Sequence, residues 1–188
     1  MKKQKLGKTV FTFPMPVVLM GTLVEDKPNF ITIAWINIAS HEPASFVASI
    51  RNTRYSMEGF KKHQTFSVNV PSVDLLKKTD RCGIYSGRTM DKSSVFNVFY
   101  GDIKTAPLIE ECPLNFECKL THTLDLGSHS LIIGEIMQTH ACESILDKGQ
   151  PNFEKLDPFL YCPGNPGEYY GLGKHLAGAF KETIKEKS

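Results

Sequence analysis

The sequence predicts a mainly β protein with short helices, folded as a closed or nearly closed β-barrel. Two observations indicate this fold class: apolar residues gather in short runs of strand length and composition, and turn-forming residues separate several of these runs. Closure is favoured because six or more antiparallel strands in an open sheet would leave exposed edges. A β-sandwich is the alternative architecture for the same pattern.

Six strands are predicted along the chain, at residues 17–24, 30–40, 44–51, 65–70, 114–121 and 129–139. Turn-forming residues occupy positions 25–29 and 40–43, between the first three strands, and positions 125–127 are expected to turn the chain before the last one. Strands joined by such short turns are antiparallel. The sequence therefore predicts hairpins at these points.

The predicted strand 30–40 has no polar face. Successive side chains of a strand point to opposite faces, and both faces of this one are mainly apolar. We expect it to be covered by the barrel core on one side and by a helix, a ligand or a second subunit on the other. Trp35 and Asn37 share one face. Tryptophan in such a place is more often core than cofactor platform, whereas a buried Asn37 must find hydrogen-bond partners, such as the edge of a heteroaromatic ring.

Two short helices complete the predicted elements. Asn52 or Thr53 is a suitable N-cap for a helix over residues 54–62, and Ser72, which follows a proline, is suitable for one over residues 73–79.

The composition indicates one domain, residues 1–188, with a core that needs no disulfide or metal. The chain is 41% hydrophobic and 22% charged, and its formal net charge of +2 argues against a nucleic-acid partner. Its five cysteines form no C-x-x-C pair, which fits reduced thiols. We therefore expect a cytoplasmic location.

An apolar stretch near the N-terminus, residues 9–24, has some features of a signal peptide. Two prolines interrupt it and no small-x-small cleavage site follows, so we do not expect secretion. Apolar runs are too short to cross a bilayer, and no membrane partner is expected.

Two polar segments are candidates for holding an anion. The first, CGIYSGRTMDK at residues 82–92, lacks the spacing of a nucleotide-triphosphate loop, but Ser86 and Gly87 suit a backbone close to an anion and Lys92 supplies charge. The second, SIRNTRYS at residues 49–56, places two arginines and a threonine at an expected helix start. The alternatives are an ordinary surface turn and a capped helix start with solvated arginines.

Metal and hydrolase sites are not supported. His122, His129 and His140 do not have the spacing of a zinc motif. The chain contains no Gly-x-Ser-x-Gly, and its cysteines lack the sequence context of a protease nucleophile.

Five segments follow one another along the chain: TIAWINIASHEPASFVASIRNTRYS, FSVNVP, RCGIYSGRTMDK, APLIEECPLNFECKL and GSHSLIIGEI. In this order they closely resemble the flavin reductase-like family, in particular its flavoredoxin branch, over most of residues 10–175. The resemblance implies a split β-barrel of Greek-key type, the FMN-binding split barrel, which forms a homodimer with FMN tightly bound at the interface. A ligand and a second subunit would explain why strand 30–40 has no polar face.

The resemblance also implies which residues form the site. Those beside the isoalloxazine ring and ribityl chain are Trp35, Asn37, Ser49 and Arg51, and those around the phosphate are Thr53, Arg54, Ser86, Gly87 and Lys92. His129 matches a histidine that in relatives sits near the flavin or the incoming nicotinamide, which makes it the candidate catalytic residue. One departure from the family is Ser93, where relatives often have an aromatic residue; it puts the local packing of Lys92 in doubt.

The implied activity is electron transfer through FMN, and two forms of it stay open. In a reductase, NADH or NADPH gives hydride to flavin N5 without a side-chain acid, and residues 49–53 stabilise the negative charge that develops near N1. In a carrier, bound FMN shuttles electrons between redox protein partners. A ligand-binding barrel without redox activity is a third reading. The chain has no Rossmann fingerprint, so any nicotinamide must bind at the flavin pocket. Residues 158–188 are expected to form a C-terminal tail or lid.

Overall fold

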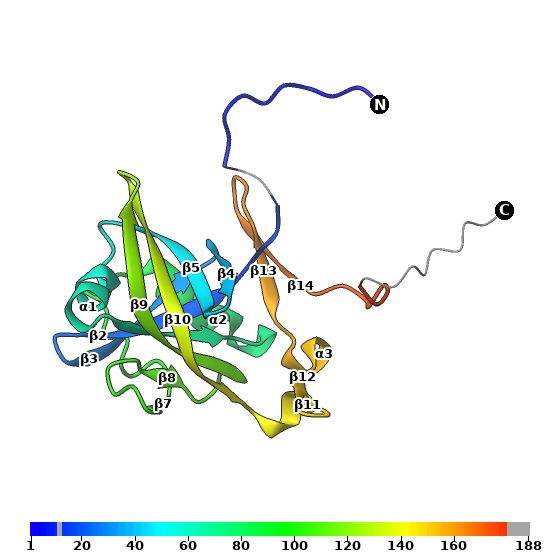
Figure 1. The fold of residues 1–188 in the computed structure, drawn as a ribbon. Helices are drawn as coiled ribbons and strands as arrows, with labels where there is room; N and C mark the ends of the chain where they lie inside the picture. Colours follow the sequence, from blue (N-terminus) through cyan, green and yellow to red (C-terminus); the bar gives the residue numbers. More distant parts are fainter. Residues whose placement is uncertain (11–12, 180–188) are drawn as a thin grey trace.

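The computed structural model describes residues 1–10 and 13–179 and confirms the predicted fold class, a mainly β split barrel (Figure 1). Within these residues the barrel is one antiparallel sheet of seven strands in the order β3-β2-β6-β9-β10-β5-β4. The strands are β2 (Val18–Val24), β3 (Lys27–Ile33), β4 (Ile36–His41), β5 (Ala44–Arg51), β6 (Thr65–Val70), β9 (Leu114–Asp125) and β10 (His129–Ala141). The edge strands β3 and β4 are consecutive in the chain, so the chain passes directly from one edge of the sheet to the other.

The predicted hairpins are confirmed, and the first two turns are tighter than expected. Glu25 and Asp26 alone join β2 to β3, at φ angles of 51° and 60°. Two consecutive left-handed residues form a turn whose twist matches that of the flanking strands. Gly127, at φ +88°, allows the chain to turn between β9 and β10, because a glycine adopts this region at little cost.

The prediction of one continuous strand at residues 30–40 is wrong. The chain bends at Ala34 and Trp35 and divides the segment into β3 and β4. The bend is held by a hydrogen bond from the Ser49 amide to the Trp35 carbonyl, 2.8 Å long. Strand β3 is largely buried, but most side chains of β4 are exposed in the single chain, so the expected cover on both faces is missing there. Sequence pattern could not locate the bend because no glycine or proline marks it.

The helices are displaced from their predicted limits. Helix α1 spans Ser56–His63 with Tyr55 at its N-cap position, so neither Asn52 nor Thr53 caps it. The predicted helix 73–79 begins where expected, with Ser72 at the N-cap position but without a side-chain capping bond; it is a 3-10 turn, η1 (Val73–Leu75), followed by α2 (Leu76–Ile84), which ends later than predicted. Residues 82–84, expected in a loop, form the last part of α2.

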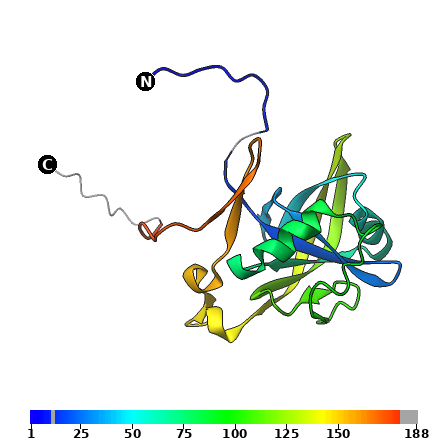
Figure 2. The same cartoon turned by 180° about the vertical axis from the view of Figure 1, so that it is seen from behind.

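The core lies between the sheet and these helices, with α1 against β2 and α2 against β3 (Figure 2). Met57 and Phe60 of α1 pack on Phe66, Ile50 and Ile132 inside the barrel. The helices thereby fix the segment between β5 and α1 and the loop after α2. These two segments carry the polar residues of the two anion-binding candidates.

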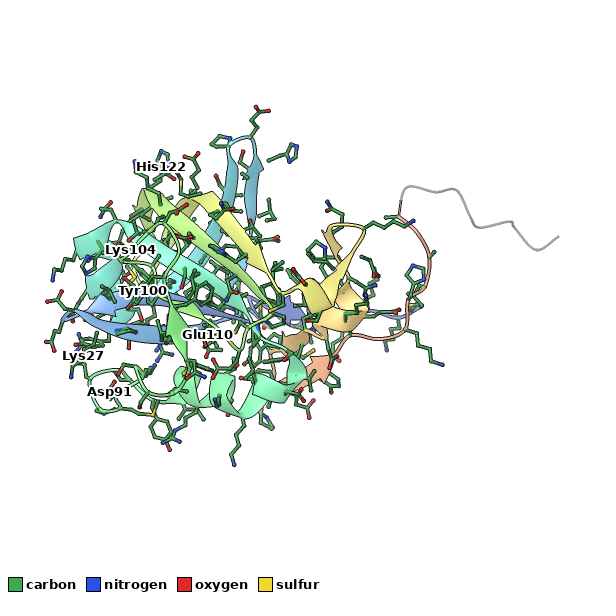
Figure 3. All side chains as sticks on the ribbon, turned by 90° about the horizontal axis from the view of Figure 1, so that it is seen from below. Lys27, Asp91, Tyr100, Lys104, Glu110 and His122 are labelled. Atoms are coloured by element: carbon green, nitrogen blue, oxygen red, sulfur yellow. The ribbon has the colours of Figure 1, made fainter. Side chains whose placement is uncertain are left out.

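A buried carboxylate fastens one loop to the sheet. Glu117 of β9 is 0% exposed and accepts hydrogen bonds from His140 Nε2 at 2.7 Å and from the backbone amides of Asp102 and Ile103 at 3.2 and 2.5 Å. Burial alone would raise the pKa of Glu117, but these hydrogen bonds outweigh it and hold the pKa below its ordinary value. The same loop carries Tyr100 and Lys104, which Figure 3 labels.

The C-terminal part packs beside the barrel as a small sheet of β1 (Met15–Pro16), β13 (Phe159–Cys162) and β14 (Glu168–Gly171). Tyr169 of β14 donates a hydrogen bond to Asp80 of α2, 2.8 Å long, which ties this sheet to the helix. The described residues near the two ends of the chain, 1–10 and 172–179, extend away from the barrel (Figure 1). Residues 180–188 of the predicted tail or lid lie outside the described residues.

The remaining short elements connect these parts. They are β7 (Val98–Phe99), β8 (Leu108–Ile109), η2 (Glu143–Ile145), β11 (Leu146–Asp147), β12 (Gln150–Pro151) and α3 (Phe153–Leu156). Among the described residues, the helices are all too short or too polar to span a membrane.

Candidate functional site

A cavity of about 200 Å³ opens where the end of β5, the start of α1 and the loop after α2 meet; we call it the cationic cavity. It contains six residues that the sequence singled out, which come from the two polar segments at residues 49–56 and 82–92. Its lining residues are Asn29, Ile31, Arg51, Thr53, Arg54, Tyr55, Ser56, Cys82, Tyr85, Ser86, Gly87 and Lys92.

The charges of this cavity are all positive. Of the described residues, those that line it include Arg51, Arg54 and Lys92 but no aspartate or glutamate. Both arginines are exposed, and within the described part of the chain their guanidinium groups make no hydrogen bond or ion pair. Burial lowers the pKa of Lys92, and the neighbouring Arg54 lowers it further. Uncompensated cations held this close together attract an anion.

Lys92 is buried, although its predicted role was only to supply charge to an anion. It is 4% exposed, and its ammonium donates to the Phe30 carbonyl at 2.9 Å and to the Cys82 carbonyl at 2.8 Å. An ammonium has three protons, so one donor is left for a ligand. Lys92 therefore joins β3 to the end of α2 as well as supplying charge.

The loop after α2 brings Ser86 and Gly87 to the cavity wall. The Ser86 carbonyl accepts hydrogen bonds from the amides of Thr89 and Met90, each 3.0 Å long, which folds the loop back on itself. A side chain at Gly87 would overlap Asn29 and come within 2.6 Å of Tyr55, so only glycine allows this approach.

The far side of this loop is fixed at the surface. Ser93, the departure from the family pattern, donates to Asp91 through its amide at 2.9 Å and its hydroxyl at 2.6 Å. These two bonds lower the pKa of Asp91, and Lys27 lowers it further; Figure 3 shows Lys27 and Asp91 on the same edge of the molecule.

A second hollow, of about 470 Å³, adjoins the cationic cavity and shares Arg51 and Arg54 with it; we call it the aromatic groove. Its wall includes Trp35 and His129, whose rings stack with centroids 5.1 Å apart and planes inclined by 28°. His129 lies opposite Arg51 across the β5–β10 ladder, which places the stack beside the cations. The flat wall is suited to a planar aromatic ligand.

A third hollow, of about 430 Å³, continues from the aromatic groove past Trp35 and Ser49 to Asn37; we call it the outer groove. Asn37 is exposed, and its side-chain oxygen accepts a 2.8 Å hydrogen bond from the amide of Ile38. The expectation that Asn37 is buried and needs an outside partner is therefore wrong in the single chain. Trp35 lies in the bend before β4 and not in a strand, and both Trp35 and Asn37 line this groove.

The structure brings together all ten residues that the sequence selected. Six line the cationic cavity, and the other four, Trp35, Asn37, Ser49 and His129, line the two grooves that continue from it.

Sequence reasoning missed several wall residues. These are Asn29, Tyr55, Cys82 and Tyr85 in the cationic cavity and Tyr161 in the aromatic groove. Tyr55 and Tyr85 are next to selected residues and could have been included, but no local signal places Asn29 or Tyr161 at the site.

Comparison with known proteins agrees with this architecture. Residues 10–169 match the family described as flavin reductase like domain. A flavoredoxin structure from Methanosarcina acetivorans is 37% identical, with a TM-score of 0.94 and 97% of each chain covered. A flavoredoxin of Desulfovibrio vulgaris (Miyazaki F) is 34% identical, with a TM-score of 0.89, and the superposition covers 96% of this chain and 99% of that chain. An uncharacterized protein of Archaeoglobus fulgidus is 30% identical over 81% of this chain and 86% of its own length.

The family match covers most of the chain, and the flavoredoxin structures superpose on nearly all of it. The chain therefore belongs to the flavin reductase like domain family.

Proposed function

We propose that this chain binds FMN, with the phosphate in the cationic cavity and the isoalloxazine ring in the aromatic groove, and that it transfers electrons through the bound flavin. The observation that carries the proposal is the set of three cations, Arg51, Arg54 and Lys92, in one cavity without a carboxylate in its wall. A phosphate monoester supplies the missing negative charge, and guanidinium groups match its oxygen geometry.

The other residues of the site fit the rest of the molecule. Thr53 and Ser86 offer hydroxyl groups in the cationic cavity, and Gly87 leaves the loop backbone accessible beside them. The stacked Trp35 and His129 side chains give the adjoining groove a flat wall. An anionic end next to a planar end is the shape of FMN.

When bound, FMN supplies hydride and electron chemistry at its ring, so the protein needs no acid of its own. Arg51 and Arg54 line both cavities, and they are placed to hold the phosphate and to stabilise negative charge on the nearby ring. His129 forms part of the ring-side wall, where we assign it to positioning the ring and the incoming electron donor.

A homodimer completes the proposal. In the single chain Trp35 is 39% exposed and Ile38 of β4 is 59% exposed, although the sequence pattern is that of a covered strand. A second copy lying on β4 would cover these side chains and exclude water from the ring site. Sedimentation equilibrium is expected to give twice the chain mass, and Ile38→Asp is expected to shift the population to monomer.

The electron donor distinguishes two forms of the function. In the reductase form, NADH or NADPH reduces FMN directly and the electrons pass to a small acceptor. In the carrier form, a redox protein partner replaces nicotinamide; the flavoredoxin names of the two solved relatives at 37% and 34% identity favour this form.

Anaerobic titration of the FMN-loaded protein with NADH and with NADPH separates the two forms. Prompt loss of flavin absorbance with either nucleotide supports the reductase. Inertness toward both, with full reduction by dithionite, supports the carrier. A purified protein that neither contains nor takes up FMN would contradict both.

A further inference from the structure

Asn52 lies between two residues of the cationic cavity, Arg51 and Thr53, yet does not line any of the three hollows described above. Its side chain instead reaches the turn between β9 and β10. The side-chain nitrogen donates to the Gly127 carbonyl at 2.8 Å and to Asp125 Oδ1 at 3.1 Å. Its oxygen accepts from the Ser130 hydroxyl at 2.7 Å.

The backbone of Asn52 makes a fourth bond to the same turn. Its amide donates to the Ser128 carbonyl at 3.2 Å, immediately beyond the last β5–β10 pair, Arg51 with His129. The strand ladder therefore ends at Arg51, and the contacts of Asn52 hold the next residues in place. Beyond it, the Arg54 amide donates to the Arg51 carbonyl at 3.0 Å and closes the turn that carries both guanidinium groups.

The same β9–β10 turn leads directly into His129, whose ring stacks on Trp35. Asn52 therefore connects the segment that carries the arginines to the hairpin that carries the aromatic stack. Both amide protons and the side-chain oxygen of Asn52 bind the β9–β10 hairpin, so a flipped amide would lose these bonds.

We infer that Asn52 is a positioning residue of the flavin site: it fixes the Arg51–Arg54 corner relative to the His129–Trp35 stack without touching the cofactor. The inference rests on the proposed function, because it assigns the corner to the phosphate of FMN. It goes beyond the expected helix-capping role of Asn52, which the structure does not support.

The decisive variant is Asn52→Ala, measured by fluorescence titration with FMN and with riboflavin, which lacks the phosphate. Loss of the side chain is expected to raise the FMN dissociation constant about tenfold, the effect of about one hydrogen bond's free energy. Riboflavin affinity is expected to change less than threefold, because riboflavin has no phosphate for the corner to bind and because the β5–β10 pairing beside the aromatic groove is retained. A purely structural role would weaken both flavins equally.

Two further variants keep the result interpretable. Thr121→Val removes a hydrogen bond of 3.0 Å to the Ile133 carbonyl within the same hairpin and does not reach the corner, so it is the matched control. Asn52→Asp keeps an acceptor for the Ser130 hydroxyl but has no proton to donate to the Gly127 carbonyl or to Asp125. It is therefore expected to lose FMN selectivity as Asn52→Ala does.

Hydrogen exchange of the FMN-free protein tests the inference separately from the function. Amides of residues 52–54 are expected to exchange faster in Asn52→Ala and at the wild-type rate in Thr121→Val. Unchanged exchange and unchanged FMN selectivity in Asn52→Ala would overturn the inference, as would an equal loss of FMN selectivity in Thr121→Val. Failure of the wild-type protein to bind FMN would instead overturn the proposed function, while the exchange result would still report on the corner.

Discussion

Replacing Arg54 with glutamine removes one charge from the cationic cavity and leaves no protein group unpaired. Within the described residues, its guanidinium makes no hydrogen bond or ion pair, so the loss falls on the ligand alone. A hydrogen bond to a charged group contributes about 1.5–3 kcal/mol, and the exposure of Arg54 places it near the lower value. Removal of Arg54 also relieves Lys92 of a nearby like charge and lets the pKa of Lys92 rise, which offsets part of the loss.

The expected result for Arg54→Gln is therefore an FMN dissociation constant about tenfold higher, with riboflavin affinity nearly unchanged, as measured by fluorescence titration. The free energy of unfolding should not fall, because the substitution removes the repulsion between Arg54 and Lys92. Lys62→Gln is the control for net charge: this lysine is exposed and pairs with Asp26 at 3.4 Å, on another part of the surface. An unchanged FMN constant, or an equal loss for riboflavin, would refute the assignment of this cavity to the phosphate.

Three other changes test separate parts of the account. Gly87→Ala is expected to reduce FMN affinity at least tenfold, a cost of about 1.4 kcal/mol, because the added methyl group overlaps Asn29; Gly173→Ala, in open space, is the control for titration. Lys92→Met is expected to lower both FMN affinity and the free energy of unfolding, the latter by about 1–3 kcal/mol in a urea titration, because two buried carbonyls lose their donor; a loss of affinity alone would contradict this. Glu117→Gln is expected to cost about 2 kcal/mol at neutral pH. The pKa of Glu117 is depressed in the folded protein, so the stability that its carboxylate contributes should be full above the ordinary carboxyl pKa and be lost as the pH drops through the lowered pKa. The difference in unfolding free energy between wild type and Glu117→Gln should therefore shrink in acid. An equal difference in urea titrations at acid and neutral pH would contradict this.

The barrel could be predicted from sequence because its strands are short apolar runs bounded by turn residues. Strands 44–51 and 65–70 were predicted at their observed limits. The bend at Ala34 and Trp35 could not be, since it is fixed by a hydrogen bond from Ser49, which belongs to another strand. Helix α1 begins later than predicted because the polar residues before it make a turn and bind a distant hairpin.

The site was predicted as a set of residues, and the structure brings that set together. Local patterns alone marked two anion-binding candidates without showing that they face one cavity. Family resemblance supplied the connection, and it also supplied His129. The depth of Lys92 and the contacts of Asn52 could not be predicted, because each depends on carbonyl or side-chain groups brought from remote segments.

A crystal structure of the FMN-loaded protein is the decisive test of the proposed site. We expect the phosphate within hydrogen-bond distance of Arg51 or Arg54 and of Ser86, with the isoalloxazine ring in the groove lined by Trp35 and His129. FMN bound elsewhere, or bound here with its phosphate in solvent and away from both arginines, would contradict it.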